Sequence, residues 1–304
     1  MTTAGLSLGL EVPAFGAAAA AQAVALGATR IELNALGSYT DGGTTPSVED
    51  LKEFCTTTTT ATANSKVPLR IMIRPRGPPP SSDTGSNRDF VYSEREFETM
   101  LGDIQGFKDS GLLDVDRGDG FVFGILKEDE DEERDDVPQG GDVKRKQKQR
   151  RCWVDRERCV RLVRATRPFK SVFHRAFDEI VSCDDSTPTS NSALASTTPS
   201  WETSLEAVAT CGFSGILTSG GLGKAIDNVA TLEKIIRKVG VLGTIEIIVG
   251  GGVRTANVKE LVQRLGLRDN RAPSSVYLHS ACLCADGSES INPDEVKGIL
   301  ARVT

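Results

Sequence analysis

The sequence has no apolar run long enough to cross a membrane. No stretch of its 304 residues approaches the roughly 20 consecutive apolar residues that a membrane helix needs. The N-terminus also lacks the basic region, apolar core and cleavage site of a secretory signal. We therefore expect a cytoplasmic protein without a membrane partner.

The chain also lacks an excess of positive charge. Its formal net charge is −6 and its pI is about 5.2. One locally basic run, KRKQKQRR at 144–151, follows the acidic run KEDEDEERDD at 127–136. Adjoining blocks of opposite sign compensate each other and are typical of a solvated insertion, so we expect no nucleic-acid partner.

The chain lacks a cysteine framework and has little histidine. The seven cysteines are odd in number and scattered, which differs from the disulfide framework of a small secreted protein and favours reduced thiols. The chain has only two histidines, and each ends an apolar run: His174 in KSVFHRAFD and His279 in SVYLHSA. If both histidines belong to one site, this would explain why each of them ends an apolar run.

Apolar, β-rich runs alternate with amphipathic helical patterns along the whole chain. Short runs that are apolar on both faces and are separated by helices are typical of a covered parallel sheet. There are eight such runs, at 6–12, 29–35, 68–75, 120–126, 170–176, 214–220, 244–251 and 274–281. Eight strand–helix units predict an α/β protein with a single (β/α)₈ TIM barrel. A doubly wound open sheet is the alternative, but no dinucleotide fingerprint occurs near the start.

Helix ends are marked by capping residues. Ser93 and Glu96 predict a capping box, with Tyr92 and Phe97 as its hydrophobic staple, for a helix from about 94 to Gly111. Thr255 is expected to cap the helix ANVKELVQRLG.

Low-complexity pieces interrupt the alternation. We expect mobile loops or helix extensions at about 56–65, 78–88, 127–152 and 184–200, because these segments have little apolar surface to bury. Without them roughly 240 residues remain, close to the usual size of one barrel. The sequence therefore predicts one domain over 1–304 with insertions.

Polar residues close most of the predicted strands. In such barrels the loops after the strands build the active site, so these residues are functional candidates that would form one ring around one barrel mouth. The ring comprises Glu11, Glu32, Asn34, Arg74, Arg76, His174, Arg175, Thr218, Ser219, His279 and Ser280. We take Glu11, Glu32, Arg74, Arg76, His174, Arg175, Asp178 and His279 as catalytic candidates.

Structural roles are open for some of them. Glu32 and Arg74 are equally suited to pair as buried ions across neighbouring strands. Asp178 is equally suited to cap the helix after the fifth strand.

The last two strands suggest an anion site. The seventh runs into GGGVR at 250–254, and the loops after strands seven and eight of barrels frequently bind phosphate. Gly251, Gly252, Ser219 and Ser280 are the candidates, with Arg74, Arg76 and Arg175 nearby; a tight turn is the other use of such glycines.

Two cysteines follow the eighth strand as a Cys-x-Cys. Cys282 and Cys284, close to His279, are soft donors suited to Cu(I) or zinc, although two thiolates make only half of a tetrahedral zinc site. The alternative is that these two cysteines are ordinary small residues without a bound metal.

Eight short motifs are spread along the chain: RIEL at 30–33, GGTTPS at 42–47, IRPRG at 73–77, DFVYS at 89–93, FHRAFD at 173–178, LTSG at 217–220, GGGV at 250–253 and HSA at 279–281. This series resembles the copper homeostasis protein CutC family. The resemblance spans nearly the whole chain apart from the insertions. It implies a (β/α)₈ barrel, an intracellular protein linked to copper tolerance or Cu(I) binding, and shared polar residues at Glu11, Arg30, Glu32, Arg74, Arg76, His174, Arg175, Asp178, Ser219 and His279.

The sequence departs from the family at two positions. Members with a proposed copper role commonly have cysteine where this chain has Pro13 and Asn34, and neither is a good ligand for a soft monovalent cation. Cys282 and Cys284 are then the remaining thiol cluster.

Three functions follow as hypotheses. The first is a copper homeostasis protein that binds Cu(I). The second is a barrel enzyme acting on a small phosphorylated or carboxylated metabolite, with His174 as general acid or base and Glu11 or Glu32 as its partner. The third is a scaffold whose insertions bind partners. Barrels of this class often form dimers, so a homodimer is a candidate assembly.

Overall fold

Eight parallel strands close into a barrel. The computed structural model describes residues 8–61, 66–79, 88–128, 151–184, 200–268 and 276–303. The strands follow the order β1-β10-β9-β8-β7-β4-β3-β2 around the ring. Their bounds are β1 Gly9–Phe15, β2 Arg30–Asn34, β3 Leu69–Met72, β4 Gly120–Phe123, β7 Lys170–Phe173, β8 Gly215–Thr218, β9 Glu246–Val249 and β10 Val276–His279.

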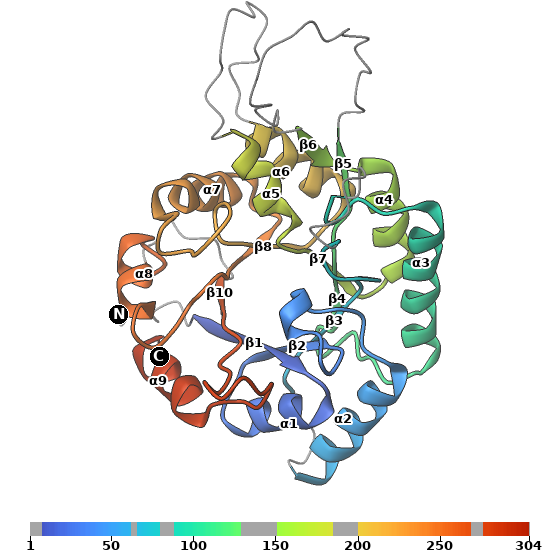
Figure 1. Cartoon of the computed structure of the whole chain (residues 1–304), viewed down its shortest axis with the longest axis vertical. Coiled ribbons are helices and arrows are strands. Elements are labelled where there is room, and N and C mark those ends of the chain that lie inside the picture. Colours follow the sequence, from blue (N-terminus) through green and yellow to red (C-terminus); the bar gives the residue numbers. More distant parts are fainter. Residues whose placement is uncertain are drawn as a thin grey trace, which may run out of the picture.

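Helices surround this ring (Figure 1). They are α1 Ala17–Ala25, α2 Val48–Ala61, α3 Glu94–Asp109, α4 Arg156–Thr166, α5 Ala176–Asp184, α6 Ser200–Cys211, α7 Val229–Leu242, α8 Val258–Arg264 and α9 Pro293–Val303, with a short 3₁₀ helix, η1, at Tyr39–Asp41. Two further strands, β5 (Leu126–Glu128) and β6 (Cys152–Val154), pair antiparallel outside the barrel.

The predicted barrel is confirmed, and each of the eight expected runs supplies one barrel strand. The expected end of the first strand is too early: β1 extends to Phe15, so Glu11 lies within β1 and not at its end. Proline normally stops a strand because it lacks an N–H donor. Pro13 is accommodated because the last rung between β1 and β10 is Glu11 with His279, and Pro13 lies beyond it.

The two helix-start predictions had different outcomes. Ser93 and Glu96 form the expected reciprocal capping box at the start of α3. The Thr255 prediction was wrong, because α8 begins at Val258 and the Thr255 hydroxyl donates to the carbonyl of Glu295 in α9. A backbone acceptor on a neighbouring helix thus competes with the local cap.

The expected insertions are described in part. Helix α2 continues through the threonine run to Ala61, which is the helix extension considered for 56–65. The charged insertion expected at 127–152 begins and ends in the paired strands β5 and β6. Residues 62–65, 80–87, 129–150 and 185–199 lie outside the described residues.

The barrel interior is divided into layers. An apolar layer crosses the middle of the barrel, formed by Met72, Val122, Val172, Leu217 and Ile248 with Tyr277 against it. Charged side chains near the strand starts, Arg30, Arg70 and Glu246, are also buried or nearly so. A larger apolar core separates the sheet from the helices. The interior therefore contains a charged layer near the strand starts and an apolar layer, and further polar groups gather at the strand ends.

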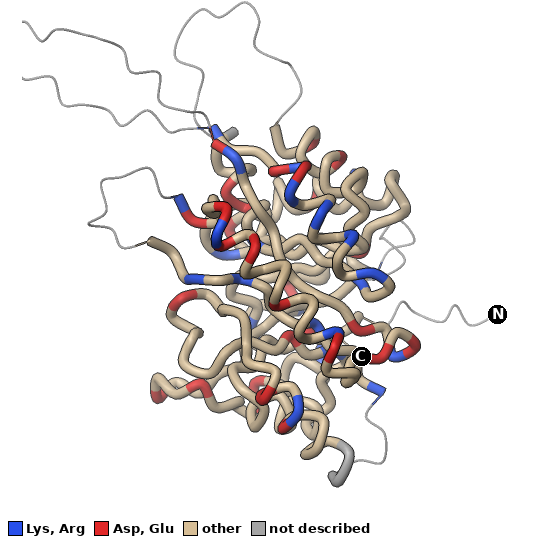
Figure 2. Tube along the Cα trace, turned by 90° about the vertical axis from the view of Figure 1, so that its right-hand side faces the viewer, with Lys and Arg blue, Asp and Glu red and all other residues tan. Residues whose placement is uncertain are grey.

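Charges of both signs are interspersed along the side of the molecule seen in Figure 2. Several form ion pairs between helices, such as Arg158 with Glu94 and Arg161 with Glu98, which join α4 to α3. Among the described residues, no helix has the length and apolarity that a membrane span requires.

Candidate functional site

A pocket of about 330 Å³ opens at the carboxyl ends of the strands. This volume falls in the range typical of small-molecule sites. Its wall includes both histidines, together with Glu32, Met72, Arg74 and Arg175. The structure thus brings the two histidines of the chain to one barrel mouth.

Glu11 connects the pocket to the barrel interior. One of its carboxylate oxygens accepts a hydrogen bond from Nε of Arg30, and the other lies 2.8 Å from Nδ1 of His279. Arg30 also donates to Glu246 at 2.7 Å, and its guanidinium stacks on the ring of Tyr277 at 3.5 Å. Burial acts to raise the pKa of Glu11, but Arg30 and His279 together lower that pKa to about 2.

Glu32 lies beside this pair, near His279, and its carboxylate forms no ion pair within the described part of the chain. Its Oε1 accepts from the Asn34 amide at 3.2 Å, whereas its Oε2 is buried without a hydrogen-bond partner among the described residues. Burial raises the pKa of Glu32, and the nearby Glu11 carboxylate raises it further. Burial acts to lower the pKa of His279, but Glu32 and Glu11 raise it above its usual value. In this acid–histidine cluster of Glu11, Glu32 and His279, the last two therefore keep a proton to higher pH than usual, whereas Glu11 loses its proton more readily.

The same three side chains are the group with metal-ligand potential in the described part of the chain. Single donor atoms of Glu11, Glu32 and His279 lie within 4.8 Å of one another. Arg30 already neutralises Glu11, and Glu11 is hydrogen-bonded to His279, so a cation would have to displace both interactions. The geometry favours a hydrogen-bonded acid cluster over a metal centre.

His174 is in a different state from His279. It follows β7, is buried, and its Nδ1 accepts the backbone N–H of Ala176 at 3.3 Å, which leaves the proton on Nε2. Phe90 packs on the ring at 4.7 Å between centroids. Burial lowers the pKa of His174 to about 3, and the neighbouring Arg74 contributes. Nε2 is buried without a partner among the described residues, so His174 presents a neutral N–H donor.

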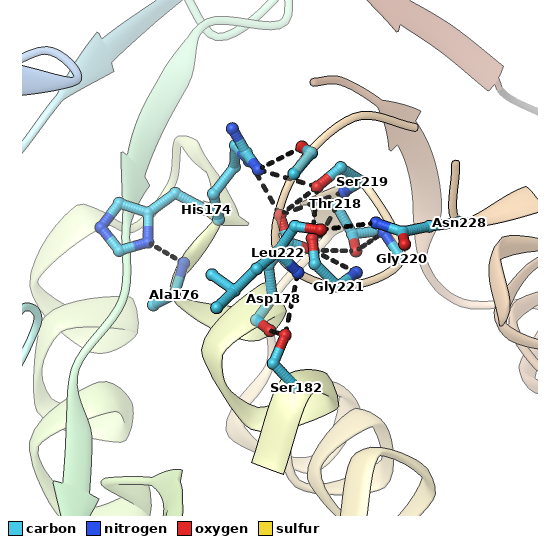
Figure 3. A network of polar contacts seen from close by, with 12 residues as sticks. His174, Ala176, Asp178, Ser182, Thr218, Ser219, Gly220, Gly221, Leu222 and Asn228 are labelled. Carbon is cyan, nitrogen blue, oxygen red and sulfur yellow. Dashed lines mark hydrogen bonds and ion pairs between the residues drawn. The ribbon is translucent and has the colours of Figure 1, made fainter. Parts of the chain in front are cut away.

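Asp178 organises the loop after β8 (Figure 3). It lies in the first turn of α5, and its carboxylate accepts hydrogen bonds from the Thr218 hydroxyl and from the backbone N–H groups of Ser219 and Gly221. Nε of Arg175 donates to it at 2.8 Å. Asp178 therefore holds β8 and α5 together across the mouth, which differs from simple capping of its own helix.

The three arginines of the predicted ring have different surroundings. Arg74 lines the pocket but donates to Asp89 and to the carbonyls of Asp41 and Gly43, so it does not form the Glu32 pair considered from sequence. Arg76 turns away to Glu96 at 2.6 Å and to the Val91 carbonyl, and it is absent from the pocket wall.

Arg175 is the most accessible of the three. Its side chain is 41% exposed, lines the pocket and donates to the hydroxyl of Ser219 at 2.8 Å.

The loop of three glycines at 250–252, after β9, packs closely against the loop that follows β8. A side chain at Gly251 would approach Cβ of Ser219 to 2.6 Å, and its φ of +89° is in the region that favours glycine. The carbonyl of Gly252 accepts from Asn257, and the Ser280 hydroxyl donates to the carbonyl of Val253. These contacts account for a tight turn beside the mouth; the anion site stays a prediction.

The two cysteines after β10 lie outside the pocket wall. Cys282 is fully buried, and its Sγ donates to the Ser280 hydroxyl at 3.4 Å. Burial raises the pKa of Cys282 to about 11. Cys284 is partly buried.

Several residues of the site escaped the sequence analysis. Phe90 and Asp89 cover the mouth, and Arg70, Glu246 and Tyr277 surround Arg30 inside the barrel. The signal that could have revealed them is a single charged residue inside an otherwise apolar strand, as in TIEIIV and LRIM. Since side chains alternate between the interior and the exterior of a barrel, such a residue can mark an interior polar layer.

Fold and site together define a (β/α)₈-barrel protein with a pocket at its mouth and the acid–histidine cluster beneath it. The CutC family model matches residues 8–139 and 142–275. The chain therefore belongs to the CutC family, as the motifs predicted.

Individual relatives agree with this assignment. The chain is 29% identical over 240 residues to the human copper homeostasis protein cutC homolog and 30% identical to that of the mouse, covering 79% of this chain in each case. It spans 63% and 64% of the length of these two relatives, just under two thirds. A CutC protein of Streptococcus agalactiae shares the fold, with a TM-score of 0.61 and 24% identity over 90% of this chain and 98% of that one.

Proposed function

We propose that the mouth pocket binds a small anionic metabolite and that the acid–histidine cluster beneath it transfers a proton. One observation carries the proposal: three side chains that line this one pocket each have a buried polar atom without a partner among the described residues. These atoms are Oε2 of Glu32, Nε of Arg74 and Nε2 of His174. Leaving such a group unsatisfied costs about 1–3 kcal/mol, and a small rotation of the side chain toward a bound ligand would relieve this cost.

Each group has a distinct role in this proposal. Arg175, exposed at the rim, holds the anionic group of the ligand because the terminal nitrogens of Arg74 are already occupied. His174 donates its Nε2 proton to a carbonyl or hydroxyl oxygen. His279, with Glu11 behind it and Glu32 beside it, is the proton-transfer group, since its raised pKa keeps a proton available near neutrality. His174, the sequence-based candidate for that role, has its Nδ1 engaged and a low pKa.

A ligand screen tests the pocket. Phosphorylated and carboxylated metabolites would be screened by thermal shift, and hits would be measured by calorimetry with wild type, Arg175→Gln and Lys259→Gln. Lys259 is a cation that lines a separate pocket of about 460 Å³ and serves as the matched control. We expect about a tenfold loss of affinity in Arg175→Gln, because the cation at the pocket rim is removed. A hit weakened by Lys259→Gln and not by Arg175→Gln would contradict the proposal.

Cu(I) binding is a second candidate, favoured by the names of the relatives and by the Cys-x-Cys beside the mouth. Thiolates and imidazole are the donor types that Cu(I) prefers, so Cys282, Cys284 and His279 fit it by donor type. Their donor atoms do not form a group within 4.8 Å in the described part of the chain, so these side chains would have to move to bind one ion. Because the pKa of Cys282 is about 11, binding there would have to release a proton.

An anaerobic Cu(I) titration against a competing chelator tests this assignment. We expect tight stoichiometric binding that is lost in Cys282→Ser/Cys284→Ser and kept in Cys152→Ser/Cys183→Ser, the matched control pair. Equal affinity in wild type and in the first variant would rule out these ligands.

A further inference from the structure

Two cysteines far apart in the sequence meet beside the barrel. Cys152 begins β6 and Cys183 lies in the last turn of α5, and their sulfur atoms are 3.5 Å apart. Cys152 is 2% exposed, whereas Cys183 is half-buried. One thiol is thus reachable from solvent and the other lies behind it.

A guanidinium group lies against the more accessible sulfur. Nη2 of Arg88 is 3.5 Å from Sγ of Cys183 and 3.1 Å from Oε2 of Glu179, which is one helical turn earlier on α5. The Cys152 thiol and then Arg88 stabilise the thiolate, lowering the pKa of Cys183 to about 6. The same sulfur contact and burial raise the pKa of Cys152. The contacts with Cys152 and Arg88 therefore favour the thiolate form of Cys183 over that of Cys152.

We propose that Cys183 and Cys152 form a reactive dithiol that reduces a hydroperoxide and closes to a disulfide. The asymmetry of the pair assigns the roles. A low-pKa, accessible thiol next to a second cysteine is the arrangement that oxidation-sensitive sites use, with the first as nucleophile and the second as resolving thiol. The second step has to bring the sulfurs from 3.5 Å to the disulfide bond length of about 2 Å.

The reaction proceeds in two steps. The Cys183 thiolate attacks one oxygen of the peroxide: an S–O bond forms, the O–O bond breaks, and the departing hydroxide takes up a proton to give water. Cys183 is then a sulfenic acid. The Cys152 sulfur attacks Cys183: an S–S bond forms, the S–O bond breaks, and the hydroxide released combines with the Cys152 proton as a second water. Two thiols have lost two electrons, and the peroxide has gained them.

A zinc site fits this pair less well. Two sulfur donors do not complete a tetrahedral zinc site, and the three-donor group found in the described part of the chain lies elsewhere, at Glu11, Glu32 and His279. Cys152, with its raised pKa, would also have to lose its proton before it could act as a ligand.

The dithiol adjoins the mouth pocket through Arg88. Glu179, which forms an ion pair with Arg88, is part of the pocket wall. Disulfide formation removes the thiolate charge beside Arg88, which strengthens the relative pull of the Glu179 carboxylate on the guanidinium. Oxidation would thereby act on the rim of the pocket.

The experiment treats the reduced full-length protein with stoichiometric hydrogen peroxide and identifies the products by peptide mass spectrometry without reduction. We expect a Cys152–Cys183 cross-linked peptide in wild type. In Cys152→Ser we expect a Cys183 sulfenic acid, captured by dimedone. The sulfenic acid should form about tenfold faster at Cys183 than at Cys55. A larger fraction of Cys183 is thiolate at neutral pH, and this outweighs the lower nucleophilicity of a low-pKa thiolate. Cys55 is also half-buried, but burial raises its pKa.

Arg88→Met tests the guanidinium. It should slow oxidation of Cys183 about tenfold, and Arg161→Met, which removes an arginine 47% exposed on α4, should leave the rate unchanged. Circular dichroism would verify that each variant is folded. Absence of the cross-linked peptide in wild type, or equal dimedone labelling of Cys183 and Cys55, would overturn the proposal.

Discussion

Glu11 and His279 join the first strand of the barrel to the last, with 2.8 Å between Oε1 of Glu11 and Nδ1 of His279. We expect Glu11→Gln to lower the pKa of His279, because the carboxylate that stabilises the imidazolium is removed. The chain has only two histidines, so an NMR titration of imidazole signals can be assigned with one variant. An unchanged titration of His279 in Glu11→Gln would contradict the coupling.

The same pair sets a stability window. A histidine with a raised folded pKa stabilises fully below its unfolded value of about 6.5, and this stabilisation is lost as pH rises through the folded value. Glu11, with its pKa lowered from 4.5 to about 2, stabilises above 4.5 and loses this effect as pH falls toward 2. The stabilisation by the pair is therefore greatest between pH 4.5 and 6.5, the ordinary pKa values of the two groups.

His174 should give the opposite pH dependence to His279. Its pKa is lowered from 6.5 to about 3, so its contribution is present above 6.5 and is lost as pH falls toward 3. The loss should be about 1.4 kcal/mol per pH unit, since unfolding takes up one proton. Urea unfolding of wild type and His174→Gln between these limits measures it. The variant should show a shallower slope, and identical slopes would show that His174 is not held neutral.

Replacing Asp178 should loosen the mouth. Asp178→Asn removes the charge that accepts hydrogen bonds from Thr218, Ser219 and Arg175, and we expect a loss of about 3 kcal/mol in the free energy of unfolding. Asp227→Asn, at an exposed position of the same loop, is the control and should change it by about 0.5 kcal/mol or less. Equal effects of the two substitutions in urea unfolding would argue against a special role for Asp178.

Arg30 should be the most costly arginine to remove. Arg30→Met leaves Glu11 and Glu246 without their shared partner inside the barrel, which should destabilise the fold by about 3–5 kcal/mol. Arg264→Met provides the comparison: Arg264 is 50% exposed and pairs with Glu260 along one helix, so the expected cost is about 0.5 kcal/mol or less. Similar midpoints for the two variants in thermal unfolding would contradict this ranking.

The barrel could be predicted because its signal is local. Eight runs that are apolar on both faces, each followed by a helical pattern, leave few architectures open. The error at β1 came from Pro13, because whether a proline ends β1 depends on where its pairing with β10 ends. The last pair between the two strands, Glu11 with His279, joins residues 268 positions apart, and no local sequence pattern contains that information.

The site was predictable only in part, because strand ends fix where a side chain starts and not where it points. His174, His279 and Glu32 meet in one pocket, whereas Arg76 is drawn away by Glu96 on α3. The partners of Arg30 include Glu246, 216 residues away. Cys152 and Cys183 likewise show no motif spacing, since their contact depends on how the outer hairpin packs on α5.

That hairpin has a consequence for how the chain tolerates change. Because β4 pairs directly with β7, the ring of the barrel is complete without β5 and β6, and the polypeptide leaves and re-enters through two paired strands. Extra sequence placed between them has only to close a loop, and each doubling of loop length adds about 0.6 kcal/mol. The position is a natural graft point, where a reporter domain could be inserted while the barrel and its mouth keep their hydrogen-bonded frame.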